Sequence, residues 1–261
     1  MLLKKIVCKW YKKIKVFCQF VISLLVNSKI SRVELFNTLE QMQLVGPGSL
    51  GICIITACFV GFVFTLQVAK EFLYFNAIGL IGAVLTIAFI RELSPVLTSV
   101  IVIGRMGSCF TAELATMKVT EQIDALYLLY TNPLIYLIVP RILASVYMLP
   151  MLNILSFATS LTSSAFVCFI LYGIDPVIFF ASSFASLSLL DFTKSLIKTI
   201  IFGFMISIIS CYWGLKATGG AQGVGKSTTS SVVTCLLTIF ILDFILSYFM
   251  FGQLESTIKT L

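Results

Sequence analysis

Four ionisable side chains inside long apolar stretches are the first candidates for chemistry. Arg91 and Glu92 are adjacent in one stretch, whereas Lys198 and Asp243 lie in two later ones. A charge at the centre of a membrane helix costs about 2.5–3.5 kcal/mol on insertion scales, so each of the four needs a partner. Neighbouring residues on a helix point about 100° apart, so Arg91 cannot simply neutralise Glu92. By sign, Arg91 would balance Asp243 and Glu92 would balance Lys198, but the sequence does not fix the pairing. The four charges form either a brace between helices or the polar lining of a passage.

A second candidate is a phosphate-binding pattern. Residues 220–227, GAQGVGKS, match G-x-x-x-x-G-K-[ST] letter for letter. That pattern binds nucleotides where a buried strand precedes it and a helix on a parallel sheet follows it. Here apolar segments of membrane-spanning length flank it instead. We therefore expect a tight cytoplasmic loop rather than a nucleotide site, in which Lys226 faces the cytoplasm and the turn is supplied by Gly220, Gly223 and Gly225.

Composition excludes several classes of protein. Of the 261 residues, 59% are apolar and 11% are charged, whereas a soluble domain carries about a quarter of charged residues. The absence of histidine excludes Ser-His-Asp and Cys-His catalysis, and the eight cysteines show no metal-ligand spacing, so we expect no bound metal or cofactor. A polytopic membrane enzyme remains the alternative, but its acidic residues would have to converge in one cluster.

Long uncharged runs predict how the elements that position these residues cross a membrane. Residues 142–174 carry no charge, and as a helix they measure about 50 Å, longer than a hydrocarbon core of about 30 Å. Residues 176–190 are apolar but too short to cross, which favours an interfacial or re-entrant helix. The predicted fold class is an all-α polytopic membrane protein, with five transmembrane helices near 48–70, 77–104, 134–172, 195–216 and 229–252.

The N-terminal arm is strongly basic. Residues 1–33 hold eight lysines and arginines and no acid, and the rest of the chain is close to neutral. This favours an amphipathic helix over residues 1–40 on an anionic membrane surface, with a transit peptide as the alternative, and not a nucleic-acid-binding face. Twelve basic residues fall on the side of the arm and four on the other, which predicts a cytoplasmic or stromal N-terminus.

The polar segment 105–133 separates the second and third predicted spans. We expect Thr120 to cap a short helix, with Glu121 and Asp124 in its first turn, and Asn132-Pro133 to end it. One face of that helix carries apolar side chains at helical spacing, namely Ile123, Leu126, Tyr127 and Tyr130. From this pattern alone the segment is either a connector packed on the bundle or a docking element for a soluble partner.

Three smaller features bear on packing. Pro95 predicts a kink one turn after Arg91. Arg141, near the cytoplasmic start of the third span, is expected to snorkel to the interface. A ridge of small residues on that span, Ser156, Ser160 and Ser164, permits a close helix contact, either within the bundle or across a dimer.

The motifs resemble those of one known family. The stretch RELSPVLTSVIVIGRMGSCFTAELATMKVTEQIDAL, the later NPLIYLIVPRILA and the loop GGAQGVGKSTTSSVV closely resemble the signature of the Mla/Tgd-type (MlaE/YrbE-like) ABC-transporter permeases. These are membrane subunits of bacterial and plastid lipid-trafficking systems. The resemblance runs from about residue 40 to the C-terminus, so residues 41–261 would form the permease domain.

The resemblance implies partners and roles. It implies a non-catalytic permease that pairs with a second copy of itself, a separate ABC ATPase holding the ATP and Mg, an MCE-type substrate-binding protein on the far side, and a phospholipid or related lipid as cargo. The four intramembrane charges would line a central cavity. The segment matching 113–131 would be the coupling helix that docks on the ATPase, with the candidate residues Glu113, Lys118, Thr120, Glu121, Gln122 and Asp124. The family occurs in bacterial inner membranes and plastid inner envelopes, and the abundance of Lys, Phe and Ile favours a plastid-encoded member.

Overall fold

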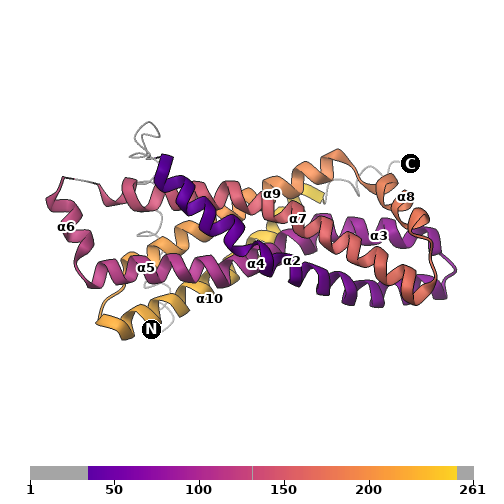
Figure 1. The fold of residues 1–261 in the computed structure, drawn as a ribbon, viewed down its shortest axis with the longest axis horizontal. Coiled ribbons are helices and arrows are strands. Elements are labelled where there is room, and N and C mark those ends of the chain that lie inside the picture. The colour runs from indigo at the N-terminus through magenta and orange to yellow at the C-terminus, as the bar shows by residue number, and fades with distance from the viewer. Residues whose placement is uncertain (1–34, 131, 252–261) are drawn as a thin grey trace, which may run out of the picture.

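The computed structural model of the chain describes residues 35–130 and 132–251. Over these residues the protein is built of helices, without a β-strand, and forms an elongated bundle (Figure 1). The predicted all-α class is therefore confirmed. The predicted amphipathic arm over residues 1–40 lies outside the described residues, except for its last six, which belong to the first described helix.

Five helical runs in the described part of the chain are long and apolar enough to cross a membrane. This agrees with the number of spans predicted from the uncharged runs. In chain order they are α2 (Leu35–Tyr74), the composite run Ile78–Val119, the composite run Leu134–Tyr172, α9 (Leu189–Leu215) and α10 (Gly220–Phe251).

The second run continues well beyond the expected end at residue 104. It has 42 residues, which as a helix measure about 60 Å, twice the thickness of a hydrocarbon core. Its last part is rich in Ala, Glu, Leu, Met and Lys, which favour a helix over a loop. Its components are η2 (Ile78–Leu80), α3 (Ile81–Ala88), the π-helical turn η3 (Phe89–Leu93), α4 (Ser94–Val102), the π-helical turn η4 (Ile103–Gly107) and α5 (Ser108–Val119).

The third run joins a π-helical turn, η5 (Leu134–Ile138), to α7 (Val139–Tyr172). Two short helices, α6 (Gln122–Leu128) and α8 (Pro176–Ser186), lie at opposite ends of the bundle (Figure 1). The eleven residues of α8 are too few to span a bilayer, as expected for that apolar segment.

The serine ridge packs inside the chain, between α7 and α2. The hydroxyl of Ser164 lies 3.4 Å from the carbonyl oxygen of Gly61. A Cβ at Gly61 would stand 2.7 Å from the carbonyl oxygen of Ser160 and would also meet the hydroxyl of Ser163. The two helices therefore approach closely because one offers hydroxyls and the other offers no side chain. This settles the alternative between a contact within the bundle and a contact across a dimer for this ridge.

A polar contact also joins α5, α9 and α10 towards the α6 end. The hydroxyl of Thr111 lies 2.8 Å from the hydroxyl of Ser231 and 3.0 Å from the carbonyl oxygen of Ser210. All three residues are buried. The surrounding core is apolar and includes Phe110, Ile206 and Cys235. The second, fourth and fifth spans are thus tied together at this level.

Candidate functional site

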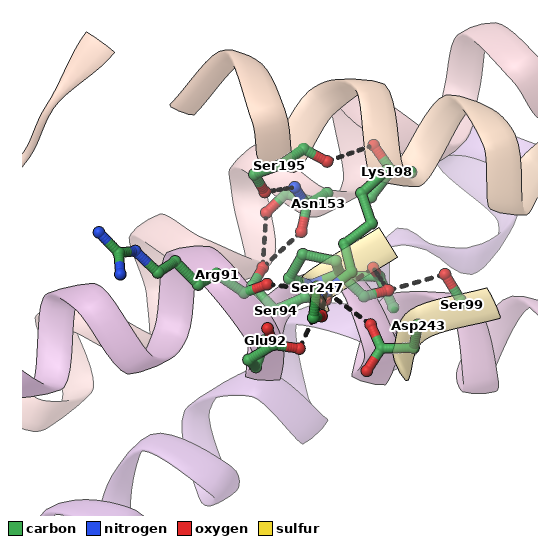
Figure 2. Close-up of polar contacts among 12 residues, drawn as sticks. Arg91, Glu92, Ser94, Ser99, Asn153, Ser195, Lys198, Asp243 and Ser247 are labelled. Carbon is green, nitrogen blue, oxygen red and sulfur yellow. Dashed lines mark hydrogen bonds and ion pairs between the residues drawn. The ribbon is translucent and has the colours of Figure 1, made fainter. Parts of the chain in front are cut away.

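Lys198 is the centre of a charged cluster between three spans, nearer the α8 end of the bundle than the α6 end. Its side chain is 0% exposed. The ammonium lies 2.9 Å from a carboxylate oxygen of Glu92 on η3 and 2.6 Å from one of Asp243 on α10. Figure 2 shows these side chains meeting from three different helices. A buried ammonium between two carboxylates is neutralised within the chain, which removes most of the cost of placing it in the membrane.

Two further acceptors complete the surroundings of Lys198. Its ammonium donates to the carbonyl oxygen of Arg91 at 3.0 Å and to the hydroxyl of Ser247 at 2.9 Å. Pro95 stands four residues after Arg91 and has no N–H, so that carbonyl lacks the usual helical donor. Lys198 therefore supplies the hydrogen bond that the proline removes. The pair of Glu92 with Lys198, which the signs allowed, is formed in this geometry.

Arg91 pairs with a residue that the sequence did not suggest. Its guanidinium lies 2.9 Å from a carboxylate oxygen of Asp191, near the start of α9, and 4.9 Å from the ring centre of Phe251. In Figure 2 the Arg91 side chain points away from Lys198 and Asp243. Of the pairs that the signs allowed, that of Arg91 with Asp243 is therefore not formed. η3 directs Arg91 and Glu92 to different neighbours, and Lys198 already holds Asp243.

The cluster is connected to α7 through an amide. Ser94 donates to the side-chain oxygen of Asn153 at 2.6 Å, and the Asn153 amide nitrogen donates to the hydroxyl of Ser195 at 3.0 Å. All three residues are buried. Since Ser195 lies one helical turn before Lys198, the second, third, fourth and fifth spans meet through hydrogen bonds or ion pairs at one level. Sequence reasoning missed Asn153, although a lone amide in a run of 33 uncharged residues was a usable signal.

At the other end of the bundle, Glu113 and Arg141 form another ion pair, in which Arg141 is buried and the Glu113 side chain is 39% exposed. Their side chains meet at 2.7 Å, and the Arg141 side chain is only 6% exposed. The expectation that Arg141 snorkels to the interface is wrong, because Glu113 on α5 reaches it inside the bundle. This contact fixes α5 to the beginning of α7. Glu113, predicted as a docking residue, is thus engaged within the chain.

The helix cap predicted at Thr120 is also wrong. The Thr120 hydroxyl donates to the carbonyl oxygen of Thr116, so it belongs to the end of α5. Glu121 precedes α6 in a left-handed conformation, with φ of 60°, and makes no side-chain cap. Lys118 and Asp124 lie 2.9 Å apart across this bend. The segment therefore turns sharply between α5 and α6 instead of starting one helix at Thr120.

The expected apolar stripe of α6 is mostly exposed. Ile123 is buried and Leu126 is half-buried, whereas Tyr127 and Tyr130 are exposed. Leu128, next to the stripe, is 82% exposed. Gln122 lies on the surface as well. A helix that packed its apolar side on the bundle would bury these side chains. The α6 surface, defined as Tyr127, Leu128 and Tyr130, is thus left uncovered by the described part of the chain.

Residues 220–227 do not form a phosphate-binding loop. Gly220 follows a turn and has φ of 69°, but Gly223, Gly225 and Lys226 lie within α10. A Cβ at Gly223 would meet the carbonyl oxygen of Thr218, so glycine is needed there for close backbone approach. The expected loop is confined to residues before 221, and the last span begins earlier than residue 229. The preceding element is α9, not a strand.

The described residues contain no group of three or more His, Cys, Asp or Glu side chains that could hold a metal ion. Six cysteines within these residues are free thiols, and four of them are buried. They behave as small apolar side chains of the core, as free cysteine commonly does.

Comparison with known proteins identifies the family. Residues 38–249 match the family model described as Permease MlaE. The chain is 53% identical to a probable ABC transporter permease of Pyropia yezoensis over 96% of this chain and 95% of that protein. It is 51% identical to a probable ABC transporter permease of Synechocystis over 87% of this chain and 86% of that protein.

A further relative comes from Arabidopsis thaliana. The protein named TRIGALACTOSYLDIACYLGLYCEROL 1, chloroplastic, is 48% identical over 85% of this chain and 64% of its own length. Together with five apolar helices long enough to cross a membrane, these matches agree with the motifs in the polar segment. The chain belongs to the MlaE family of ABC-transporter permeases and is a multi-pass membrane permease subunit.

Proposed function

We propose that the chain is the membrane half of an ATP-driven lipid transporter, and that a separate ATPase drives it by docking on the α6 surface. The observation that carries this proposal is the exposure of Tyr127, Leu128 and Tyr130, just after a helical run of 42 residues that is longer than a hydrocarbon core is thick. Apolar side chains gathered on a water-facing surface mark interaction sites. ATP and Mg would bind to the ATPase, with no cofactor on this chain.

The neighbouring contacts make α6 suitable for transmitting force. Lys118 and Asp124 tie α6 to α5, and Glu113 and Arg141 tie α5 to α7. Helix α5 continues through η4 and α4 to the turn that carries Arg91 and Glu92. A displacement of α6 by the ATPase would therefore be passed along a single helical run to the Lys198 cluster.

For the cargo, we propose that lipid passes the edge of the Lys198 cluster and does not enter it. Lys198 is closed off, while the Glu92 side chain is 43% exposed and Arg91 is partly exposed. The cluster then serves as a brace between the spans, and its accessible edge meets the headgroup. A phospholipid or related glycerolipid fits this role, and the name of the Arabidopsis relative contains a glycerolipid.

The assembly would contain two copies of this chain, since ABC transporters need two membrane halves and the described residues of one chain hold five candidate spans. We further propose an MCE-type substrate-binding protein at the α8 end and a cytoplasmic or stromal location for the N-terminus and α6. For the membrane we propose a plastid inner envelope, on the abundance of Lys, Phe and Ile in the sequence. The relatives fit both options, since those of Pyropia and Arabidopsis agree with a plastid and that of Synechocystis with a bacterial inner membrane.

The docking test compares two single substitutions at opposite ends of the bundle. Leu128→Asp places a charge on the α6 surface, and the control Val177→Asp places one on the similarly exposed apolar side chain of α8. The ATPase should co-purify with the wild-type chain and with Val177→Asp, but not with Leu128→Asp. Equal recovery with both variants would refute docking at α6.

The lipid test uses liposomes that contain the complex with its ATPase and its MCE-type partner. ATP-dependent transfer of a fluorescent glycerolipid is expected, and it should disappear when the ATPase carries an inactivated nucleotide site. Transfer at the same rate without ATP would show that the chain is not an ATP-driven lipid permease. A membrane enzyme is not favoured, because Lys198 holds both acids that converge on it, Glu92 and Asp243.

A further inference from the structure

Arg105 is a membrane-region cation with no partner in the described part of the chain. It lies in the π-helical turn η4 and its side chain is exposed. No carboxylate of the described residues forms an ion pair with it, and its guanidinium has no hydrogen-bond partner there. Arg91 and Arg141, by contrast, each hold an acid at hydrogen-bonding distance. An arginine left unpaired at this position calls for a negative ligand from outside.

The guanidinium of Arg105 lies against the backbone of α2, the neighbouring helix. A Cβ at Gly48 of α2 would stand 3.2 Å and 3.3 Å from the two terminal nitrogens of its guanidinium. Gly48 follows Pro47 and Gly46, so three successive residues of α2 offer little or no side chain at this level. The guanidinium is thus seated against α2, with its remaining donors turned to the surroundings. A seated guanidinium loses less conformational freedom when it binds a ligand than one on an open surface.

The depth of Arg105 corresponds to the headgroup layer. Arg105 lies twenty-seven residues after Ile78, which is about 40 Å along the helical run. A bilayer is about 30 Å thick in its hydrocarbon core and about 40–45 Å with its headgroups. With the Ile78 end at one surface, and allowing for the usual tilt, Arg105 reaches the phosphate region of the opposite leaflet.

The third span places an interfacial residue at the same depth. Tyr147 on α7 lies twenty-five residues before Tyr172, about 38 Å from the α8-side end of its helix, and it is exposed. A Cβ at Gly46 of α2 would meet Met148, the next residue along α7, whereas a Cβ at Gly48 would meet Arg105. Exposed tyrosine is typical of a membrane–water interface. Two helices thus place this interface at the level of Arg105.

We propose that Arg105, seated over Gly48, binds the phosphate group of an anionic phospholipid in the leaflet on the α6 side. A planar guanidinium can donate two parallel hydrogen bonds to phosphate oxygens, and its positive charge favours a lipid with net negative charge over a zwitterionic one. The site lies about 20 Å along the run from Arg91. The bound lipid is therefore a resident of this site and distinct from the cargo at the Lys198 cluster.

The test measures binding to the purified full-length chain in uncharged detergent by microscale thermophoresis, without an ATPase. The probes are dioctanoyl phosphatidylglycerol, dioctanoyl phosphatidylcholine and inorganic phosphate. Of the three probes, we expect the wild-type chain to bind dioctanoyl phosphatidylglycerol most tightly. Arg105→Gln should weaken it about tenfold, as expected for the loss of a charge-assisted contact.

Matched variants separate a seated arginine from general surface charge. Gly48→Ala places a Cβ against the guanidinium and should weaken binding about threefold, less than the loss of the charge itself. Gly51→Ala is the control on the same helix, because a Cβ there meets nothing within 4 Å. Lys226→Gln is the control for another exposed cation towards the α6 end of the bundle. Both controls should bind within about twofold of the wild type.

Each contrary outcome overturns a defined part of the proposal. If Arg105→Gln binds phosphatidylglycerol like the wild type while eluting as a folded chain, Arg105 is not the site. If Lys226→Gln weakens binding as much, the effect is general electrostatics. If inorganic phosphate binds equally well through Arg105, the ligand is free phosphate and not lipid. Since no ATPase is present, none of these results bears on docking at α6.

Discussion

The Lys198 cluster and the α6 surface lie towards opposite ends of the same chain and satisfy opposite requirements. In the cluster, charged groups stand in an apolar region, and Lys198 is closed off by Glu92 and Asp243. On the α6 surface, apolar groups stand at the end of the bundle that we propose to lie outside the membrane, and Leu128 and Tyr130 remain uncovered. The chain therefore neutralises its intramembrane charges with its own side chains, whereas the apolar side chains of the α6 surface remain exposed.

This difference indicates which parts of the function are internal and which depend on another molecule. A buried unpaired charge is costly at all times, so its partners must belong to the same chain. An exposed apolar patch has a smaller cost and can remain until a partner covers it. The comparison predicts that substitutions in the cluster change the stability of the chain, whereas substitutions on α6 change its assembly.

The largest effect on stability is expected for Lys198→Met. Removing the ammonium leaves Glu92 and Asp243 facing each other without a cation, which should lower the free energy of unfolding by about 3–5 kcal/mol. Denaturant unfolding in detergent micelles measures this quantity. The control Lys226→Met removes an exposed cation and should stay within about 0.5 kcal/mol of the wild type. Equal stability of the two variants would mean that the cluster is not a brace.

A smaller loss is expected for Arg141→Met. It removes the contact with Glu113, whose carboxylate is still partly reached by solvent, so the free energy of unfolding should fall by about 1–3 kcal/mol. Lys118→Met is the matched control, because its pair with Asp124 is exposed and should contribute about 0–1 kcal/mol. The same unfolding experiment applies. If Lys118→Met lowered the free energy of unfolding more than Arg141→Met, the pair of Lys118 with Asp124 would be the more important contact for stability, contrary to this account.

Leu128→Asp should leave the free energy of unfolding within about 0.5 kcal/mol of the wild type, because the side chain makes little contact with the bundle. The same variant is expected to lose the ATPase, which separates assembly from stability. A chain that unfolds several kcal/mol more easily would show that α6 is held by contacts within its own bundle.

No effect is expected for Lys226→Ala on nucleotide binding by the assembled complex. Lys226 lies on the surface of helix α10, and the element before α10 is helix α9. The strand and glycine-rich loop that would hold a phosphate are therefore not formed at this position. Binding of a fluorescent ATP analogue measures this. A loss of binding would revive the phosphate-loop interpretation of residues 220–227.

The sequence was sufficient to predict the fold class, because a long uncharged run can satisfy its backbone hydrogen bonds within a membrane by forming a helix. It did not indicate that the helix of the second span continues past residue 104 to Val119, because polar residues after Arg105 end the apolar run although most of them favour a helix. The shape of the polar segment was missed for a related reason. Its sharp bend depends on the left-handed conformation of Glu121, which no pattern in the sequence indicated.

The sequence predicted which four charged residues lie within the spans, but not which side chains pair with each other. Opposite signs allowed a pair of Glu92 with Lys198 without fixing it. The partner of Arg91 depends on how far η3 rotates the second span and on where α9 begins. Asp191 was not predicted as a partner, because it follows the apolar segment 176–190 and a charge at the edge of such a segment does not by itself require a partner. The pair of Glu113 and Arg141 depends likewise on the distance between two helices, which the sequence does not specify.

The most direct test of the central claim is ATP hydrolysis by three purified preparations: the chain alone, the chain with its ATPase, and the Leu128→Asp chain with the same ATPase. We predict no hydrolysis by the chain alone, and stimulation of the ATPase by the wild-type chain but not by the Leu128→Asp chain. Hydrolysis by the chain alone, or undiminished stimulation by Leu128→Asp, would contradict a permease that is driven through α6 by a separate subunit.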